Sequence, residues 1–369
     1  MTAFSRRIAL SMGAAATAVF ISGTAAQAEE VVHVYNWVDY IGETTLEDFT
    51  KATGIKVVYD TYDAAETEEA KILAGSSGYD VVLHSGSSIP KFIQAGAFQK
   101  IDRSKLTNWD NQDPGILKTV DNWDPGNEYS VVYMWGTTGI TYNLDMVKER
   151  LGDDAPLGTM DIIMKPELAA KVADCGISVL ESPRDVIPMV LSYLGKNPNT
   201  EDPADYDAVV EAFKPVRQYI KTFDASNYLN AIPNKELCVI NNWSGDYATA
   251  TSRASDAGIE INLSYEVPAT GSPAWFDLWA IPSDAKNVEN AHKFLNFMLD
   301  AKVIAGATNF TYYANANLKA NEFVSKEILE DPAIYPNEEL KKRLWTSKSL
   351  TPAAQRALTR AWTKIKTGS

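Results

Sequence analysis

The sequence predicts an α/β fold with two lobes, and three observations support this prediction. The chain has 369 residues, which is enough for two lobes that each bury a core of their own. Hydrophobic residues make up 45% and charged residues 22%, which is typical of globular proteins and excludes a disordered chain, a collagen-like repeat and a coiled-coil rod. Near the start of the chain, short apolar runs alternate with helical patterns, which predicts a mostly parallel sheet with helices on both faces.

Three strands and three helices are predicted at the start of the chain. Short runs rich in β-branched and aromatic residues predict strands, and amphipathic patterns that end near glycine predict helices. In chain order, these elements are strand 31–37, helix 43–53, strand 55–59, helix 66–74, strand 79–83 and helix 89–95. Ligands of such sheets bind beyond the carboxyl ends of the strands, so segments 37–40 and 84–88 are candidate site positions.

The remaining elements are predicted from the same patterns. Residues 130–135 and 139–142 are expected to be two strands that meet at 136–138, and residues 207–223 have the periodicity of one helix. Further strands are predicted at 177–180, 238–242, 259–266 and 276–281, and helices at 291–299 and 338–366, the last with a break at Pro352.

The first 28 residues are predicted to be a signal peptide. Arg6 and Arg7 form a short positive region, an apolar and small-residue run covers 8–26, and Ala26-Gln27-Ala28 is a small-x-small cleavage pattern. A membrane anchor is the alternative, which the small-residue composition and the missing basic flank disfavour. Cleavage after Ala28 predicts an exported, periplasmic protein, with the export route (general or twin-arginine) left open.

Charge and cysteine content narrow the class of protein. The formal net charge of −14 would repel a phosphate backbone, so nucleic acid is not an expected partner. Two cysteines, Cys175 and Cys238, in an exported chain predict one disulfide, and two separate buried thiols are the alternative. A cysteine pair this far apart with so few histidines is not a metal-site pattern.

The motifs of common enzymes do not occur in the sequence. Its three histidines are scattered, and no metalloprotease, nucleophile-elbow, phosphate-loop or dinucleotide-binding pattern is present. His84 and Ser85 are adjacent on a predicted strand, where side chains point to opposite faces, so they make a poor base and nucleophile. We therefore expect a protein that is not an enzyme and that needs no cofactor and no metal.

Aromatic residues beside carboxylates recur at predicted strand ends. Segments 37–40, 243–246 and 275–277 carry this pairing, and Arg184-Asp185 supplies a further acid. Each pair alone is better explained by a core aromatic and a solvated or capping acid, and Asp246 is a candidate helix cap. Together they predict a pocket for a linear chain with an amine at each end, because carboxylates bind ammonium groups and aromatic faces cover both cations and methylenes.

A ligand that carries a carboxylate would make a different demand on this pocket. It would need a cationic anchor, usually an arginine, and Arg184 is the candidate near these segments. The sequence therefore leaves open a zwitterion such as 4-aminobutyrate as an alternative to a diamine. A ligand sensor that reports to a signalling partner is a second alternative.

Seven segments also carry a family resemblance that covers essentially the whole mature chain. They are 34–41, 54–57, 78–82, 136–143, 243–246, 275–277 and 313–317. Together they resemble the periplasmic polyamine-binding proteins of ABC importers, the putrescine- and spermidine-binding group of substrate-binding proteins. The chain is most similar to the putrescine-binding branch, including its cysteine pair.

The resemblance implies a two-lobed periplasmic binding protein of the type II flytrap class, with a mostly parallel mixed sheet in each lobe. Lobe 1 is expected to hold residues 29–137 and 266–324, and lobe 2 residues 138–265 and 325–369. The hinge is expected near 136–139 and 267–271. The resemblance further implies a monomer that captures a polyamine between its lobes and delivers it to the membrane permease of an ABC importer.

The resemblance also assigns ligand-binding positions. Aromatic residues cover the aliphatic chain of the ligand, acids bind its amino groups, and two hydroxyl groups hydrogen-bond to it. The positions are Trp37, Val38, Asp39, Tyr40, Ser85, Asp185, Trp243, Asp246, Trp275, Asp277 and Tyr313. Val38 stands where the putrescine branch usually carries serine, and Asp185 where the family usually has glutamate. Both differences leave open whether the ligand is putrescine, cadaverine, agmatine, spermidine or another amine.

Overall fold

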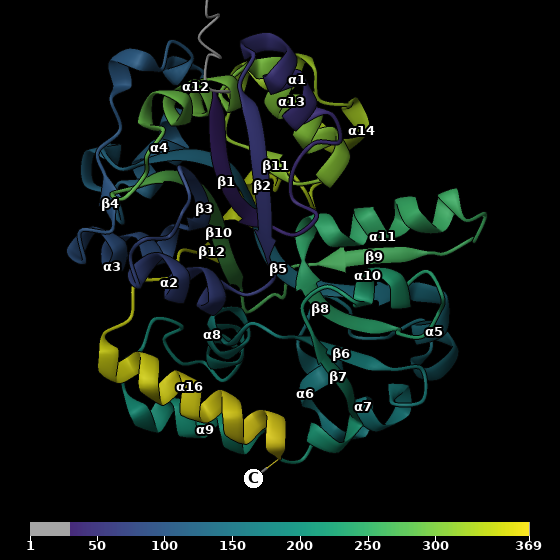
Figure 1. Cartoon of the computed structure of the whole chain (residues 1–369). Helices are drawn as coiled ribbons and strands as arrows, with labels where there is room; N and C mark the ends of the chain where they lie inside the picture. Colours follow the sequence, from purple (N-terminus) through teal and green to yellow (C-terminus); the bar gives the residue numbers. More distant parts are fainter. Residues whose placement is uncertain (1–29, 369) are drawn as a thin grey trace, which may run out of the picture.

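Two lobes, one above the other in Figure 1, make up the protein. The computed structural model describes residues 30–368, so the predicted signal peptide and its cleavage site lie outside the described residues. A single long strand, β5 (Ser130–Asn143), belongs to the sheets of both lobes. The two strands predicted at 130–135 and 139–142 are therefore wrong as separate elements, because Gly136 and its neighbours continue the extended backbone instead of turning it.

The first lobe is built on a sheet with the strand order β2-β1-β3-β10-β5. β1 is parallel to β2 and β3, whereas β10 runs antiparallel between β3 and the first half of β5. The strands are β1 (Val31–Trp37), β2 (Lys56–Tyr62), β3 (Val81–Ser85) and β10 (Ser272–Pro282), with short additions β4 (Phe98–Gln99), β11 (Ala314–Asn315) and β12 (Leu344–Trp345). Its helices are α1 (Thr45–Thr53), α2 (Ala65–Leu73), α3 (Ile89–Gln94), α4 (Pro114–Val120), α12 (Val288–Met298), α13 (Ala301–Thr311) and α14 (Lys326–Leu329).

The predicted elements of this lobe form with small shifts at their ends. α1 ends at Gly54, whose φ of 74° is a left-handed conformation that glycine adopts without steric cost and whose N–H bonds the carbonyl of Thr50. Val32 and Val34 of β1 are fully buried, as expected for a strand inside a sheet covered on both faces.

The second lobe is built on the other half of β5. Here β5 pairs antiparallel with β8 and β9, and β6 lies parallel to β7 and β8. The strands are β6 (Ile177–Leu180), β7 (Ile220–Asp224), β8 (Val239–Trp243) and β9 (Leu263–Glu266). The helices are α5 (Leu144–Leu151), α6 (Asp161–Met164), α7 (Pro166–Val172), α8 (Pro183–Tyr193), α9 (Pro203–Phe213), α10 (Tyr228–Ala231), α11 (Ser244–Asp256) and α16 (Pro352–Thr367). Each lobe thus has a sheet of parallel and antiparallel strands packed against helices, which confirms the predicted α/β fold class.

Three predicted elements differ from the structure. The helix predicted over 207–223 ends at Phe213, because Pro215 follows, and the chain then forms the strand β7. The strand predicted over 259–266 covers only β9. The helix predicted over 338–366 is divided into α15 (Glu338–Lys341), β12 and α16, since β12 pairs with Ser272 and Pro273 of β10.

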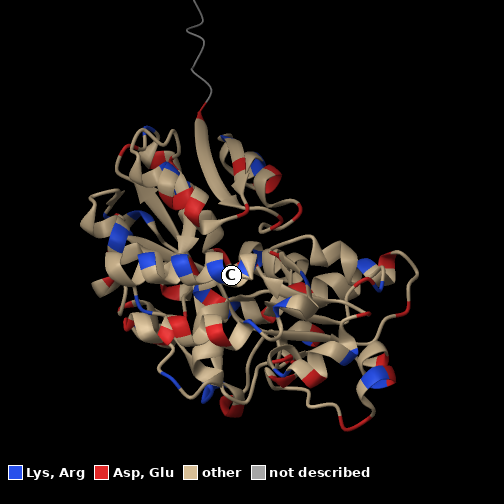
Figure 2. Ribbon diagram, turned by 90° about the horizontal axis from the view of Figure 1, so that it is seen from below, with Lys and Arg blue, Asp and Glu red and all other residues tan. Residues whose placement is uncertain are grey.

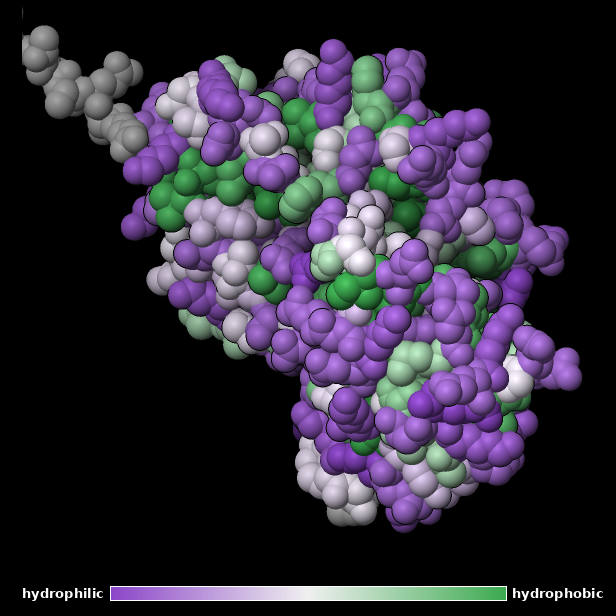
Figure 3. Space-filling model, turned by 90° about the vertical axis from the view of Figure 1, so that its right-hand side faces the viewer, coloured by the Kyte–Doolittle hydropathy of each residue, from purple (hydrophilic) through white to green (hydrophobic). Residues whose placement is uncertain are grey.

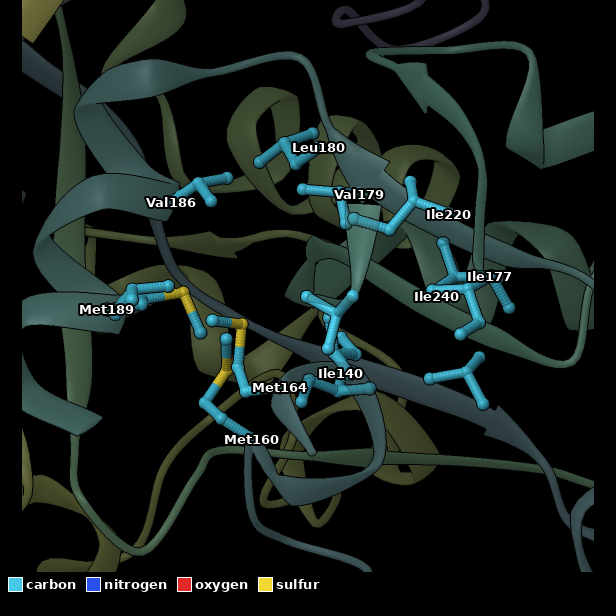
Figure 4. Packing of buried hydrophobic residues seen from close by; sticks show 14 of the residues in the cluster. Ile140, Met160, Met164, Ile177, Val179, Leu180, Val186, Met189, Ile220 and Ile240 are labelled. Atoms are coloured by element: carbon cyan, nitrogen blue, oxygen red, sulfur yellow. The ribbon is translucent and has the colours of Figure 1, made fainter. Parts of the chain in front are cut away.

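The two lobes have separate hydrophobic cores. In the second lobe, Figure 4 shows Met160, Met164 and Met189 lying together against Ile140 of β5. Cys175 and Cys238 are buried in this same core and form a disulfide, which confirms the prediction from the cysteine count. The apolar face of α16 also packs here, beside α9 in Figure 1.

The chain passes between the lobes at three places. The first is the middle of β5, the second lies between β9 and β10, and the third lies between β12 and α16. The predicted lobe boundaries stay a prediction. We propose that the second segment of lobe 1 ends beyond Tyr335 and not at residue 324, because Ile328 and Ile334 are buried in the core of the first lobe.

The surface is polar and carries charges of both signs. Figure 2 shows acidic and basic residues interspersed over both lobes. On the side seen in Figure 3, hydrophobic residues lie in separate groups among hydrophilic ones. Within residues 30–368, no helix has the length and apolar character needed to cross a membrane.

Candidate ligand-binding site

A cavity of about 410 Å³ lies between the two lobes, and segments of both lobes line it. All eleven residues predicted for the site line this cavity. They are Trp37, Val38, Asp39, Tyr40, Ser85, Asp185, Trp243, Asp246, Trp275, Asp277 and Tyr313. The structure thus brings together residues that are far apart in the sequence. Their roles toward a ligand stay a prediction.

Asp277 lies on the sheet of the first lobe, in the interior of β10 and not at a strand end as predicted. It pairs with Ser85 of β3 and Met134 of β5, and the next residue, Leu278, pairs with Val132, so Tyr133 of β5 is skipped in the register at this position. The residue is 8% exposed. Burial raises the pKa of Asp277 to about 8, the hydroxyl of Tyr40 lowers it, and the negative charge of Asp185 raises it.

Asp246 lies in the first turn of α11 and accepts hydrogen bonds from two tyrosines. The hydroxyl of Tyr228 donates to Oδ2, and that of Tyr313 donates to Oδ1 at 2.5 Å across the lobes. Both oxygens are therefore engaged away from the helix backbone, so Asp246 is not a helix cap. Burial raises its pKa to about 6, against the lowering effect of the two hydrogen bonds.

Asp185 supplies a third acid from the first turn of α8. Its Oδ1 accepts a hydrogen bond from the hydroxyl of Thr138 at 2.7 Å, and its Oδ2 accepts one from Ser182 at 2.5 Å. Burial raises the pKa of Asp185, and these two hydrogen bonds lower it. Thr138 belongs to β5, so the strand that joins the lobes also orients this carboxylate.

Asp39 differs from the other acids because it lies at the mouth of the cavity. Its φ of 54° is a left-handed conformation that aspartate tolerates better than most residues. Its side chain is 68% exposed, and its Oδ2 lies 3.5 Å from Nη2 of Arg253 in the other lobe. Val38 beside it is 41% exposed. We expect Asp39 to contribute less to ligand affinity than the buried acids, because solvent screens its charge.

Aromatic rings form the walls between these acids. The Trp37 ring packs 4.4 Å from that of Tyr62, and the edges of Tyr40 and Trp275 meet Tyr313 at 5.2 and 5.3 Å between ring centres. The indole N–H groups of Trp37 and Trp275 are buried without a hydrogen-bond partner among the described residues. The walls therefore combine apolar faces with two free donors.

Two glycines allow the rings to approach the backbone this closely. A Cβ atom at Gly136 would come within 2.5 Å of the Trp275 ring, and one at Gly245 within 2.8 Å of the Tyr313 ring. Even alanine at either position would displace a wall of the cavity.

Several residues that line the cavity or hydrogen-bond to its acids were missed from the sequence. Tyr228 lies in the short helix α10, which no motif marks, so no sequence signal points to it. Arg253 follows Asp246 by seven residues, which places both on one face of α11, and this helical spacing could have identified it. Ser182 and Thr138 were missed because hydroxyl residues carry no pattern of their own.

The cavity carries an excess of negative charge. Its lining acids are Asp39, Asp63, Asp185, Asp246, Asp256 and Asp277, and its lining cations are Arg184 and Arg253. Each arginine is paired with an acid of the first lobe, Arg184 with Glu69 and Arg253 with Asp39. Among the described residues, Asp185, Asp246 and Asp277 therefore have no cation within ion-pair distance. A cationic ligand would supply the missing positive charge.

Comparison with known proteins identifies relatives along the full chain. The family model for bacterial extracellular solute-binding proteins matches residues 44–336. The chain is 46% identical over 349 residues to the putrescine-binding periplasmic protein SpuD of Pseudomonas aeruginosa, covering 94% of this chain and 95% of that protein. It is 42% identical over 369 residues to the putrescine-binding periplasmic protein PotF of Escherichia coli, covering 100% of both. The spermidine/putrescine ABC transporter substrate-binding protein PotD from Streptococcus pneumoniae has a similar structure, with a TM-score of 0.75, 30% identity and coverage of 92% of this chain and 99% of that one.

Proposed function

We propose that this chain, which belongs to the family of bacterial extracellular solute-binding proteins, captures a polyamine between its lobes and delivers it to the membrane permease of an ABC importer. One observation carries the proposal. Two buried carboxylates, Asp246 and Asp277, and the half-buried Asp185 line an aromatic-walled cavity, and none of the three has a cation within ion-pair distance among residues 30–368. Protonated amines on an aliphatic chain fit this arrangement, because each ammonium group replaces the missing charge and the methylenes cover the rings.

In the arrangement we propose, Asp246 and Asp277 bind one ammonium group. Trp37 and Trp275 cover the aliphatic chain, and Asp185 binds the far end, with Asp39 nearer the solvent. These acids come from both lobes, so a diamine would join the lobes and favour the closed form. Closure excludes water and strengthens each ion pair.

A thermal-shift screen of protein freed of ligand by unfolding and refolding tests the ligand class. The panel holds putrescine, cadaverine, agmatine, spermidine and spermine beside arginine and 4-aminobutyrate. A ligand at one hundred times its dissociation constant stabilises the folded state by about 2.7 kcal/mol, which is a visible rise in melting temperature. We expect a rise with one or two polyamines. A rise with 4-aminobutyrate alone would refute the ligand class.

The choice among polyamines is a separate proposal that depends on Val38 and Asp185. Valine cannot donate or accept a hydrogen bond at the cavity mouth, and aspartate is one methylene shorter than glutamate. The same screen with V38S and D185E is expected to change the order of preferred polyamines. An unchanged order in both variants would exclude these positions as determinants.

The export and transport steps have their own tests. We propose that residues 1–28 are removed after Ala28, and N-terminal sequencing of the exported protein is expected to begin at Glu29. Deletion of the gene is expected to abolish uptake of labelled polyamine, and uptake that continues unchanged would contradict a transport role. Incubation with polyamines is expected to return them chemically unchanged, since we infer a binding protein and not an enzyme.

A further inference from the structure

We propose that Glu69 sets the charge selectivity of the cleft by binding Arg184, so that this arginine cannot anchor the carboxylate of an amino-acid ligand. Glu69 belongs to α2 of the first lobe and Arg184 to α8 of the second. The inference rests on the proposed function. Glu69 is a positioning residue, because it acts on ligand selectivity through Arg184.

The contact between the two side chains is a two-pronged ion pair across the lobes. Nη1 of Arg184 donates to Oε1 of Glu69 at 2.6 Å, and Nη2 donates to Oε2 at 3.0 Å. This parallel geometry is the strongest that a guanidinium and a carboxylate make. Nη1 also donates to the hydroxyl of Ser88 at 2.9 Å, so its position is fixed from two sides.

Glu69 is held in its charged form by its surroundings. Its side chain is only 6% exposed, and it also accepts from Lys91 at 2.8 Å and from Ser88 at 2.7 Å. Burial raises the pKa of Glu69, but the hydrogen bonds from Arg184, Lys91 and Ser88 and the charge of Arg184 outweigh it and lower the pKa to about 2. Glu69 therefore neutralises Arg184 over the whole physiological pH range.

Arg184 is close enough to the cleft to act as an anchor if it were released. It lines the cavity and directly precedes Asp185 in the first turn of α8. Its Nε is buried and has no hydrogen-bond partner among the described residues. Loss of the Glu69 charge would leave a guanidinium with free donors beside the proposed ligand.

Arg253, the other lining cation, cannot replace Arg184 in this role. It lies at the mouth, where its side chain is 38% exposed and its partner Asp39 is more exposed still. A cation in that position is screened by solvent. The rejection of carboxylates in the inner cleft therefore depends on the Arg184–Glu69 pair.

The test measures the dissociation constants of putrescine and 4-aminobutyrate by calorimetry, for the wild-type protein and for E69Q. Glutamine in place of Glu69 would keep the shape of the side chain and lose its charge. The quantity compared is the dissociation constant of 4-aminobutyrate divided by that of putrescine. Where 4-aminobutyrate does not bind measurably, this ratio is a lower bound. The ratio is expected to fall by roughly tenfold or more in E69Q, which is the scale of one charge-assisted hydrogen bond. The same ratio in a folded E69Q protein would overturn the inference.

Three further variants make the test specific. E69Q/R184Q is expected to lose the gain in 4-aminobutyrate binding, because the anchor is gone. K91M removes the other cation on Glu69 and is expected to keep the wild-type ratio. The double variant E68Q/E69Q tests whether the buried neighbour Glu68 takes over the ion pair with Arg184 when Glu69 has lost its charge. It is expected to lower the ratio at least as far as E69Q does.

The two proposals fail in different ways. A wild-type protein that binds no polyamine would refute the proposed function. A wild-type protein that binds putrescine, with the same ratio in E69Q and E68Q/E69Q, would refute only the role of Glu69.

Discussion

Ligand binding should release a proton, because Asp277 is largely protonated in the empty cleft. With a pKa of about 8, about one tenth of the Asp277 carboxyl groups are ionised at pH 7. Asp246, with a pKa of about 6, is about nine tenths ionised at that pH. An ammonium group favours the ionised form of both acids, and the amine itself has a pKa near 10 and stays protonated. Binding at pH 7 is therefore expected to release about one proton in total.

The same values give the pH dependence of the affinity. The ionised fraction of Asp277 is about one half at pH 8 and about one hundredth at pH 6, which weakens binding about fiftyfold between these pH values. Asp246 contributes a further factor of about two. The dissociation constant of putrescine is thus expected to rise about a hundredfold from pH 8 to pH 6. D277N removes the larger factor, so its affinity should be weaker at pH 8 and change only about twofold over this range.

Calorimetry in two buffers of different ionisation enthalpy, such as phosphate and Tris, measures the released proton directly. The observed binding enthalpy is expected to differ between the buffers by the difference in ionisation enthalpy for about one proton at pH 7. D277N is the matched variant and should release only the small fraction that Asp246 contributes. A wild-type dissociation constant that is the same at pH 6 and pH 8, with no proton released, would refute the assignment of Asp277.

Three further predictions concern affinity and stability. D246N is expected to weaken polyamine binding by about 1.5–3 kcal/mol, the scale of a charge-assisted hydrogen bond, whereas D39N at the exposed mouth should cost less; equal losses by calorimetry would contradict the difference in burial. D277N is expected to raise the melting temperature of the ligand-free protein at pH 8 but not at pH 4. Asp277 keeps its proton up to about pH 8 in the folded state but only up to about pH 4 in the unfolded state. The unfolding free energy of the wild type therefore falls by up to about 1.4 kcal/mol per pH unit as the pH rises between these values, and D277N removes this loss. Replacing both Cys175 and Cys238 by serine should cost roughly 4 kcal/mol of unfolding free energy, because the disulfide spans 63 residues; denaturation midpoints that match the wild type would contradict this.

Local patterns predicted most elements of the fold. The six elements predicted over residues 31–95 all form, since each depends on periodicity and glycine signals within about ten residues. The errors occur where distant segments decide the structure. The strand β7 forms because the edge of β6 accepts it, and β12 forms because β10 lies beside it. Neither partner is visible within the window of residues that a pattern covers.

In the candidate site, too, local patterns identified the residue types, whereas contacts between distant segments decided their environment. The aromatic and acidic segments around Trp37, Trp243 and Trp275 were identifiable because they recur in the sequence. Which acids are buried was not identifiable, since Asp39 and Asp277 each follow a tryptophan by two residues, yet Asp39 is exposed and Asp277 is buried in β10. Burial changes the pKa of a carboxyl group and the strength of its ion pairs, so the chemistry of each acid depends on its position in the fold.

The sequence by itself indicated the α/β class, the one cysteine pair that could form a disulfide and the residue types that line the cavity. The tertiary structure decided which groups are free to bind. Arg184 is a candidate carboxylate anchor in the sequence, and 115 residues separate it from Glu69, yet the two meet in a part-buried ion pair across the lobes. Residue types and periodicity are local properties, whereas burial and pairing depend on which distant segments meet when the chain folds.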